Sequence, residues 1–180
     1  MANQALIIID IQNDYFAGGA MELHQPVEAA NKAAKLIEHF RASNLPVIHI
    51  QQLSLREELG FLLPGTKGQE IHPSVEPLAG EKVVVKHFPN AFAKTDLIHI
   101  LEQMNVSDIV VAGMMTHMCV SSTIRAALEY GLKTTVAHDA CATRDLEVLG
   151  KQVLAEDVHI TALAEIAPIT HICSSDEIIS

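Results

Sequence analysis

Residues 108–131 have the sequence DIVVAGMMTHMCVSSTIRAALEYG, and their pattern changes once, at Gly113. The first five residues are rich in β-branched side chains and apolar on both faces, which is typical of an interior parallel strand. Beyond the glycine we expect a helix with Thr116 as its cap and Gly131 as its left-handed stop. Apolar residues recur there at helical spacing: Val120, Thr123, Ile124, Ala127 and Leu128. The stretch therefore predicts a strand, a turn and a helix, the repeating unit of a parallel α/β sheet.

The same alternation of short apolar runs and helical patterns extends over the whole chain. Helices are predicted from Pro26 to just before Asn44, over about 95–104, after Thr116, and over about 145–165 with a break near Asp157. This alternation is typical of a three-layer, doubly wound α/β fold, in which six mostly parallel strands carry helices on both faces. The six predicted strands are residues 5–11, 46–51, 82–86, 108–112, 133–137 and 169–173.

Residues 53–81 fit neither pattern, because they contain three prolines and four glycines without sustained periodicity. So long an irregular segment in a compact domain is usually functional, as a lid or a substrate loop. A solvated connection is the alternative, and the sequence favours neither. With no linker elsewhere, residues 1–180 are expected to form one domain.

Composition narrows the possible partners. The chain has 180 residues, with 12 Lys and Arg against 22 Asp and Glu. So acidic a chain is not expected to bind nucleic acid or an anionic membrane, since both attract a basic surface. No run approaches the ~20 apolar residues of a membrane span, and the first residues lack the basic segment of a secretory signal. Three widely spaced cysteines predict no disulfide framework, so a cytoplasmic, reducing location is expected.

Three chemically active side chains are predicted at one edge of the sheet. In open parallel α/β sheets, ligands bind in the crevice beyond the carboxyl ends of the strands. Asp10 ends the first predicted strand, Lys86 ends the third, and Cys119 lies in the first turn of the helix after the fourth. The ammonium can keep the carboxylate ionised, and the carboxylate can accept the thiol proton. A nucleophile, a base and an orienting charge are thus predicted without a histidine.

Each of these residues also has a structural explanation. A free cysteine is most often a small buried apolar residue, Asp10 could form a cap or a turn, and Lys86 could end its strand in solvent. A helix start, however, lowers the pKa of a cysteine from about 8.5 by one to several units, which favours a thiolate at Cys119. Cys141 and Cys173 lack this placement, so they are expected to be structural.

The ten histidines offer no stronger alternative. His117 is only two residues from Cys119, so their side chains are expected on different helix faces rather than as a catalytic pair. His138 and Asp139 are interpreted as polar turn residues. No H-x-H, C-x-x-C or H-E-x-x-H spacing occurs, so no metal is expected. No glycine-rich phosphate loop follows the first strand, so no nucleotide is implied.

At these residues the sequence resembles the isochorismatase-like cysteine hydrolases, a superfamily that includes nicotinamidases, N-carbamoylsarcosine amidase, ureidoacrylate amidohydrolase and streptothricin hydrolase. The resemblance covers nearly the whole chain. Its most specific part is the G-x-x-T-x-x-C-V pattern that joins a strand to a helix. It rests on LIIIDIQNDYF (6–16), LPGTKGQEIHPSVEP (63–77), KHFPNAFAKTDL (86–97), VVAGMMTHMCVSSTIRAALEYG (110–131) and VAHDACAT (136–143).

The resemblance implies roles for particular residues. It implies a catalytic triad of Asp10, Lys86 and Cys119, and a non-proline cis peptide between Met114 and Met115. The backbone N–H groups of Met115 and Cys119 would form an oxyanion hole, which would stabilise the transition state by a few kcal/mol for each donor. Positions that bind substrate in parts of the family match Gln12, Phe16, Phe92 and His117.

Two departures bear on the substrate. Nicotinamidases carry a metal-binding D-x-H element after the second strand, and the corresponding stretch is VIHIQQLS (47–54), with Gln52 and Ser54 in place of the ligands. Neither a metal nor nicotinamide is therefore expected. Members that hydrolyse isochorismate, a vinyl ether, lack the nucleophilic cysteine. Cys119 thus favours an amide, ureido or lactam-type substrate whose C–N bond is cleaved through a thioester.

Other functions stay open at this point. An inactive or redox-active relative would only bind ligand or use Cys119 reversibly, and a vinyl ether hydrolase would act on a different bond. No cofactor is expected. The expected partners are a small amide-like substrate and further copies of the chain, as a homodimer or a larger assembly, because helix faces are apolar and relatives are often oligomeric.

Overall fold

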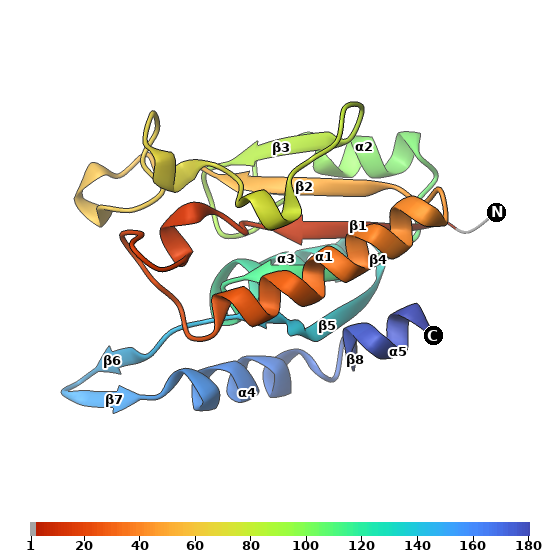
Figure 1. Ribbon diagram of the computed structural model, residues 1–180. Helices are drawn as coiled ribbons and strands as arrows, with labels where there is room; N and C mark the ends of the chain where they lie inside the picture. The colour runs from red at the N-terminus through yellow and green to blue at the C-terminus, as the bar shows by residue number, and fades with distance from the viewer. Residues whose placement is uncertain (1–2) are drawn as a thin grey trace.

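The computed structural model describes residues 3–180 and has a six-stranded central sheet in the order β3-β2-β1-β4-β5-β8 (Figure 1). Every neighbouring pair in this sheet is parallel. The predicted α/β class and the six strands are therefore confirmed. The strands are β1 (Gln4–Ile9), β2 (Val47–Gln52), β3 (Lys82–Lys86), β4 (Asp108–Met114), β5 (Lys133–Ala142) and β8 (His171–Cys173).

Helices cover both faces of this sheet. In β1, Leu6 and Ile8 belong to one hydrophobic cluster, which includes residues of α1 (Pro26–Ala42). Ile7 and Ile9 belong to the cluster on the other face. All four side chains are buried, and each such aliphatic side chain contributes about 1.5–3 kcal/mol to folding. The other helices are α2 (Leu97–Gln103), α3 (Ser121–Glu129), α4 (Ala155–Ile166) and α5 (Ser175–Ile179).

The winding direction of the sheet reverses between β1 and β4. From β1 the chain proceeds to β2 and β3 on one side, and it then returns to the other side of β1 for β4, β5 and β8. In a doubly wound sheet such a reversal separates the connections that leave the two strands, and ligands bind there. The residues that follow β1 and β4, Asp10 and Met115, therefore border the expected binding crevice.

The first part of the segment 53–81 lies beyond the carboxyl ends of β2 and β3, and its last part returns past β2 to the start of β3 (Figure 1). It contains three short 3-10 helices, at Glu57–Leu59, Lys67–Gln69 and Pro73–Val75. Asp14 anchors it, because its carboxylate accepts hydrogen bonds from the backbone N–H groups of Ala20 and Leu62. Leu62 is fully buried, and a Cβ at Gly68 would overlap the Asp14 carboxylate. The segment is thus packed onto the sheet edge.

The predicted helix over 145–165 is wrong in nearly its first half. There the chain forms an antiparallel hairpin of β6 (Leu146–Val148) and β7 (Lys151–Val153), and α4 begins only at Ala155. Leu149 and Gly150 both have positive φ, at 54° and 69°, as a two-residue hairpin turn requires. Asp145 accepts a hydrogen bond from the Ala155 N–H, which joins the hairpin to the helix start. The predicted break near Asp157 is also wrong, since that residue lies within α4.

None of the helices in residues 3–180 is long and apolar enough to cross a bilayer.

Candidate active site

Asp10, Lys86 and Cys119 come together beyond the carboxyl ends of β1, β3 and β4. Lys86 Nζ lies 2.7 Å from Asp10 Oδ2 and 3.3 Å from Cys119 Sγ. Asp10 and Lys86 are fully buried, and Cys119 is 5% exposed. The sequence predicted this meeting from strand ends alone. The arrangement places a thiol, a carboxylate and an ammonium in one buried cluster.

The backbone around Asp10 brings it close to β4. Asp10 follows β1 with φ of 50°, a left-handed conformation that aspartate tolerates better than most residues. Across from it, Ile9 pairs with Gly113 in β4. Gly113 has φ of 137°, and a Cβ there would overlap the Ile9 carbonyl oxygen. The glycine therefore allows the two strands to approach as closely as the site requires.

Two glutamines orient Lys86. Gln52, the last residue of β2, accepts a hydrogen bond from Lys86 Nζ at 2.6 Å. Gln12 in turn holds the backbone of Gln52 in place. Its amide oxygen accepts a hydrogen bond from the Gln52 N–H, and its amide nitrogen donates to the carbonyls of Gln52 and Gln69. Gln12 was expected to bind substrate, yet its side-chain amide is used in joining β2 to the segment 53–81.

The pKa values of the thiol, the carboxylate and the ammonium in this cluster are all raised from their ordinary values. Burial raises the pKa of the Cys119 thiol to about 12; repulsion from Asp10 adds to this effect and attraction by Lys86 opposes it. Burial also raises the pKa of Asp10, although Lys86 opposes that shift. For Lys86, burial is outweighed by attraction to Asp10 and Cys119, so its pKa is raised. The expectation of a lowered pKa at Cys119 is therefore wrong in direction, because the sulfur is desolvated and lies next to a carboxylate.

The Asp10 carboxylate retains acceptor positions. Its Oδ2 forms an ion pair with Lys86 at 2.7 Å. Its Oδ1 is buried and has no hydrogen-bond partner among residues 3–180. Asp10 Oδ2 and the Cys119 sulfur both contact Lys86 Nζ, so the thiol lies next to the carboxylate. A carboxylate in this state can accept a proton from the thiol.

A π-helical turn, Thr116–Val120, presents Cys119 before α3 begins at Ser121. The predicted Thr116 cap is wrong. The Thr116 hydroxyl instead bonds to the Ala142 carbonyl and the His159 ring.

The preceding peptide bond, Met114–Met115, is cis, as the resemblance implied. The Met115 N–H makes no hydrogen bond within residues 3–180, so it is available to a ligand.

A cavity of about 680 Å³ opens over Cys119, within the usual range of about 300–1,000 Å³ for small-molecule sites. Met115, His117 and Met118 form part of its wall, together with Tyr15 and Arg144. The segment 53–81 contributes Ser54, Leu55, Arg56, Leu59, Phe61 and Leu62. The cavity is thus walled largely by apolar side chains and has the thiol at its base.

The suggested substrate-binding residues differ in where they lie. His117 lines the cavity, and its Nδ1 is 2.6 Å from the Thr143 hydroxyl. Phe16 and Phe92 are buried and do not line it. Phe16 stacks on His72 with ring centroids 3.7 Å apart, so it supports the segment 53–81. Phe92 packs in the core on the α3 face. None of the three other suggested residues lines the cavity, so we expect them to support its wall: Gln12, Phe16 and Phe92.

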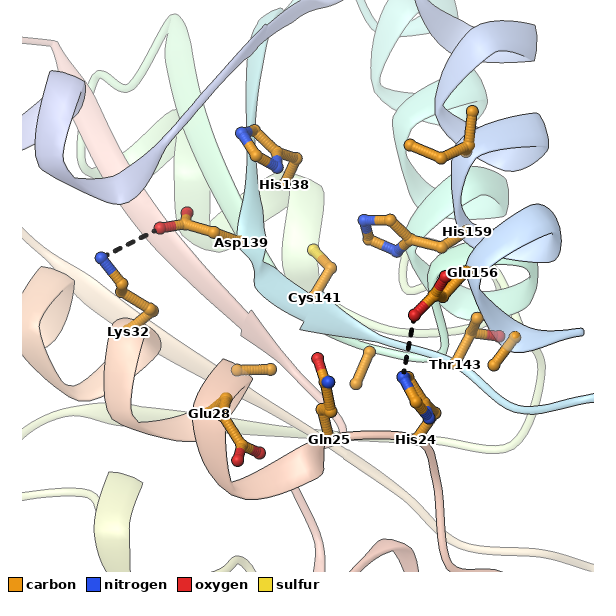
Figure 2. A pocket seen from close by; sticks show the side chains of 14 residues that line it. His24, Gln25, Glu28, Lys32, His138, Asp139, Cys141, Thr143, Glu156 and His159 are labelled. Atoms are coloured by element: carbon orange, nitrogen blue, oxygen red, sulfur yellow. Dashed lines mark ion pairs between the residues drawn. The ribbon is translucent and has the colours of Figure 1, made fainter.

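A second cavity, of about 500 Å³, lies between α1, β5 and α4 (Figure 2). Figure 2 shows ion pairs at its rim, where Lys32 is 3.3 Å from Asp139 and His24 is 3.7 Å from Glu156. Cys141 is at its floor and is buried, which is consistent with its expected structural role. None of Asp10, Lys86 and Cys119 lines this cavity. Of these three residues, Cys119 lines the first cavity.

Sequence reasoning missed Gln52 as a partner of Lys86, and it missed Arg144 on the cavity wall. The rule that found Asp10 and Lys86, polar residues at strand ends, also applies to Gln52, which ends β2. Arg144 follows β5 in the same way. Both could have been found by listing every polar residue at that edge.

Comparison with known proteins identifies the family of the chain. The Isochorismatase domain model matches residues 4–177. The chain is 49% identical to the uncharacterized isochorismatase family protein YddQ of Bacillus subtilis over 89% of both chains. It is 34% identical to a streptothricin hydrolase of Streptomyces noursei over 79% of this chain and 51% of that protein.

Among solved structures, a putative isochorismatase hydrolase from Oleispira antarctica superimposes with a TM-score of 0.94. It is 42% identical, and the match covers 98% of this chain and 95% of that one. The domain match, the relatives and the shared structure agree, so the chain belongs to the isochorismatase family of hydrolases.

Proposed function

We propose that this protein is an amidohydrolase that cleaves a C–N bond of a small molecule through a thioester on Cys119. The observation that carries the proposal is the cluster at the base of the cavity. There, Lys86 Nζ contacts both Asp10 Oδ2 at 2.7 Å and Cys119 Sγ at 3.3 Å. A buried ammonium between a carboxylate and a thiol is costly to maintain, and catalysis accounts for it.

In the first half of the reaction, Asp10 takes the thiol proton as Cys119 Sγ forms a bond to the substrate carbonyl carbon. The carbonyl oxygen becomes an oxyanion, which accepts hydrogen bonds from the N–H groups of Met115 and Cys119. The C–N bond then breaks, and Asp10 returns the proton to the departing nitrogen. Ammonia or an amine leaves, and a thioester remains.

In the second half, water attacks the thioester carbonyl and gives a proton to Asp10. The C–S bond breaks, and the sulfur recovers the proton from Asp10. The product is a carboxylic acid, and each residue returns to its starting state. Lys86 stays charged throughout, so its ammonium stabilises whichever of Asp10 and Cys119 carries the negative charge.

The raised thiol pKa favours this route over reversible redox chemistry. Cysteines that sense oxidants are exposed and have low pKa values, whereas Cys119 is buried and its pKa is raised to about 12. Such a thiol needs a base at the moment of attack, and Asp10 is beside it. A relative from Streptomyces noursei is named streptothricin hydrolase, and this name also favours hydrolysis over redox chemistry.

The test is ammonia release from a panel of primary amides and ureido acids. The wild type should consume at least one of them, and Cys119→Ala should consume none while keeping the wild-type circular dichroism spectrum and melting temperature. Cys173→Ser is the matched control, because this half-buried cysteine does not line the cavity. Full activity of Cys119→Ala would remove Cys119 as the nucleophile.

We further propose that the chain self-associates, with a second copy covering the hairpin of β6 and β7. The hairpin extends away from the body (Figure 1) and exposes Val148 at 61%, Leu149 at 95% and Leu154, just after it, at 57%. A two-stranded hairpin is only marginally stable in water on its own, so added burial of these side chains would stabilise it. Light scattering should find an oligomer that Leu149→Ser weakens, whereas a monomeric wild type would contradict the proposal.

A further inference from the structure

The cavity over Cys119 is lined by positive and neutral side chains in a chain that is strongly acidic. The protein has 22 Asp and Glu against 12 Lys and Arg. Among the residues that line the cavity, however, there is no Asp or Glu, and there are two arginines, Arg56 and Arg144. A pocket whose charge opposes that of its protein favours a ligand of negative charge.

Arg56 already has a partner. Its Nε donates to Glu58 Oε1 at 2.9 Å, and both side chains are 67% exposed. The two histidines of the wall, His87 and His117, already contact neighbouring oxygen atoms. His87 Nδ1 is 2.9 Å from the Leu53 carbonyl and His117 Nδ1 is 2.6 Å from the Thr143 hydroxyl. Burial, and then repulsion from Arg144, lower the pKa of His117. The cation without a counterion is therefore Arg144.

Arg144 is half-buried, just after the end of β5. Its guanidinium has no carboxylate within ion-pair distance in residues 3–180, and its buried Nε has no hydrogen-bond acceptor there. Its one hydrogen bond in that part of the chain is a long one, from Nη1 to the Asp145 carbonyl at 3.3 Å. Buried polar groups are nearly always paired, so an unpaired guanidinium nitrogen at a cavity wall indicates an absent ligand.

We infer that the substrate carries a carboxylate and that Arg144 binds it. The planar guanidinium presents parallel N–H groups that match the two oxygens of a carboxylate. The substrate class is then a small amide or ureido compound with a carboxylate at one end and the scissile carbonyl at the other. The apolar wall of Leu55, Leu59 and Phe61 would enclose the chain between them. This inference rests on the proposed function, since it takes the carbonyl to be the group attacked by Cys119.

Pairs of substrates with and without a carboxylate test whether the cavity prefers a negatively charged substrate. The monoamides of malonic, succinic, glutaric and adipic acid each carry one carboxylate, and the corresponding diamides are neutral and of similar shape. The wild type should have a KM for the best monoamide lower than for its diamide by about tenfold to a hundredfold, as expected for a charge-assisted hydrogen bond. Equal KM values, or a preference for the diamide, would overturn the inference.

Single substitutions test whether Arg144 is the residue that binds the carboxylate. Arg144→Gln should raise the KM of the monoamide by about tenfold to a hundredfold and leave that of the diamide unchanged, while Arg144→Lys should recover part of the loss. Arg125→Gln, on the outer side of α3 and paired with Glu165, should behave as wild type. If Arg56→Gln instead produces the selective loss, the carboxylate is bound by the other arginine and the assignment to Arg144 is wrong.

A binding measurement separates this inference from the proposed function. Calorimetric titration of Cys119→Ala with the monoamides should show binding that Arg144→Gln, added to it, weakens by a similar factor. Binding with this dependence but no turnover by the wild type would overturn the hydrolase proposal alone. Turnover of neutral amides with no effect of Arg144→Gln would overturn the anion site alone. If none of the monoamides binds, the proposed anion site is also overturned.

Discussion

Glu81 connects the site to the rest of the fold, and its replacement by Gln should destabilise the protein in a pH-dependent way. The carboxylate accepts hydrogen bonds from Arg41 Nε and Nη2, both at 2.8 Å, and from the Leu78 N–H at 2.8 Å. His49 Nε2 is 3.1 Å away. These contacts join the end of α1 to the start of β3, the strand that ends in Lys86.

The magnitude follows from the pKa of Glu81. Burial opposes ionisation, but the hydrogen bonds of Arg41, Leu78 and His49 outweigh it and lower the pKa from 4.5 to about 2. The side chain is 14% exposed, so little of this is screened by solvent. A shift of that size corresponds to about 3 kcal/mol of folding free energy as an upper bound.

The sign of the pH dependence is fixed by the lowered pKa. The unfolded chain binds the proton first, so the stabilisation is complete above about pH 4.5 and is lost as the pH falls toward about 2. Urea unfolding should find Glu81→Gln less stable than wild type by up to about 3 kcal/mol near neutral pH, with more than half of that difference gone by about pH 3.

Glu165→Gln is the matched control, because Glu165 is 60% exposed and pairs with Arg125 at 3.1 Å. An exposed pair of this kind contributes at most about 1 kcal/mol, so the control should change little at any pH. A Glu81→Gln difference that stays constant from neutral to acidic pH, or that grows on acidification, would refute the reasoning.

Three further predictions concern the reactive cluster. Lys86→Met should reduce kcat by about a thousandfold or more in steady-state assays, because Asp10 would lose its buried counterion and become protonated. Gly113→Ala should lower the free energy of unfolding by more than about 2 kcal/mol in urea titrations and abolish turnover, since its Cβ would overlap the Ile9 carbonyl. Cys119 should react with iodoacetamide more slowly than a free thiol at neutral pH and accelerate only in alkali, since its pKa is raised to about 12; mass spectrometry of the labelled peptide measures this rate.

The sequence predicted the sheet and the meeting of three residues because both depend on simple regularities. Interior parallel strands are apolar on both faces, as β1 is, and their carboxyl ends meet at one edge. Asp10, Lys86 and Cys119 could therefore be placed together although 109 positions, 119 minus 10, separate the first from the last.

Other features depend on contacts that no local pattern reveals. The residues before α4 carry apolar side chains at spacings that also suit a helix, and only the positive φ values of Leu149 and Gly150 turn them into a hairpin. The pKa of Cys119 depends on burial beneath residues far away in sequence, so its position in a first helical turn gave the wrong direction. Gln12 was matched to a pocket position, yet it bonds to Gln52, which is 40 residues away.

The most direct measurement of the central claim is mass spectrometry of the protein quenched in acid during turnover of an active amide. We expect one acyl group, of the mass of the substrate without its leaving amine, on the peptide that contains Cys119. The adduct should be absent from Cys119→Ala and should disappear when the substrate is exhausted. Turnover with no acylated protein, together with an active Cys119→Ala variant, would contradict the account.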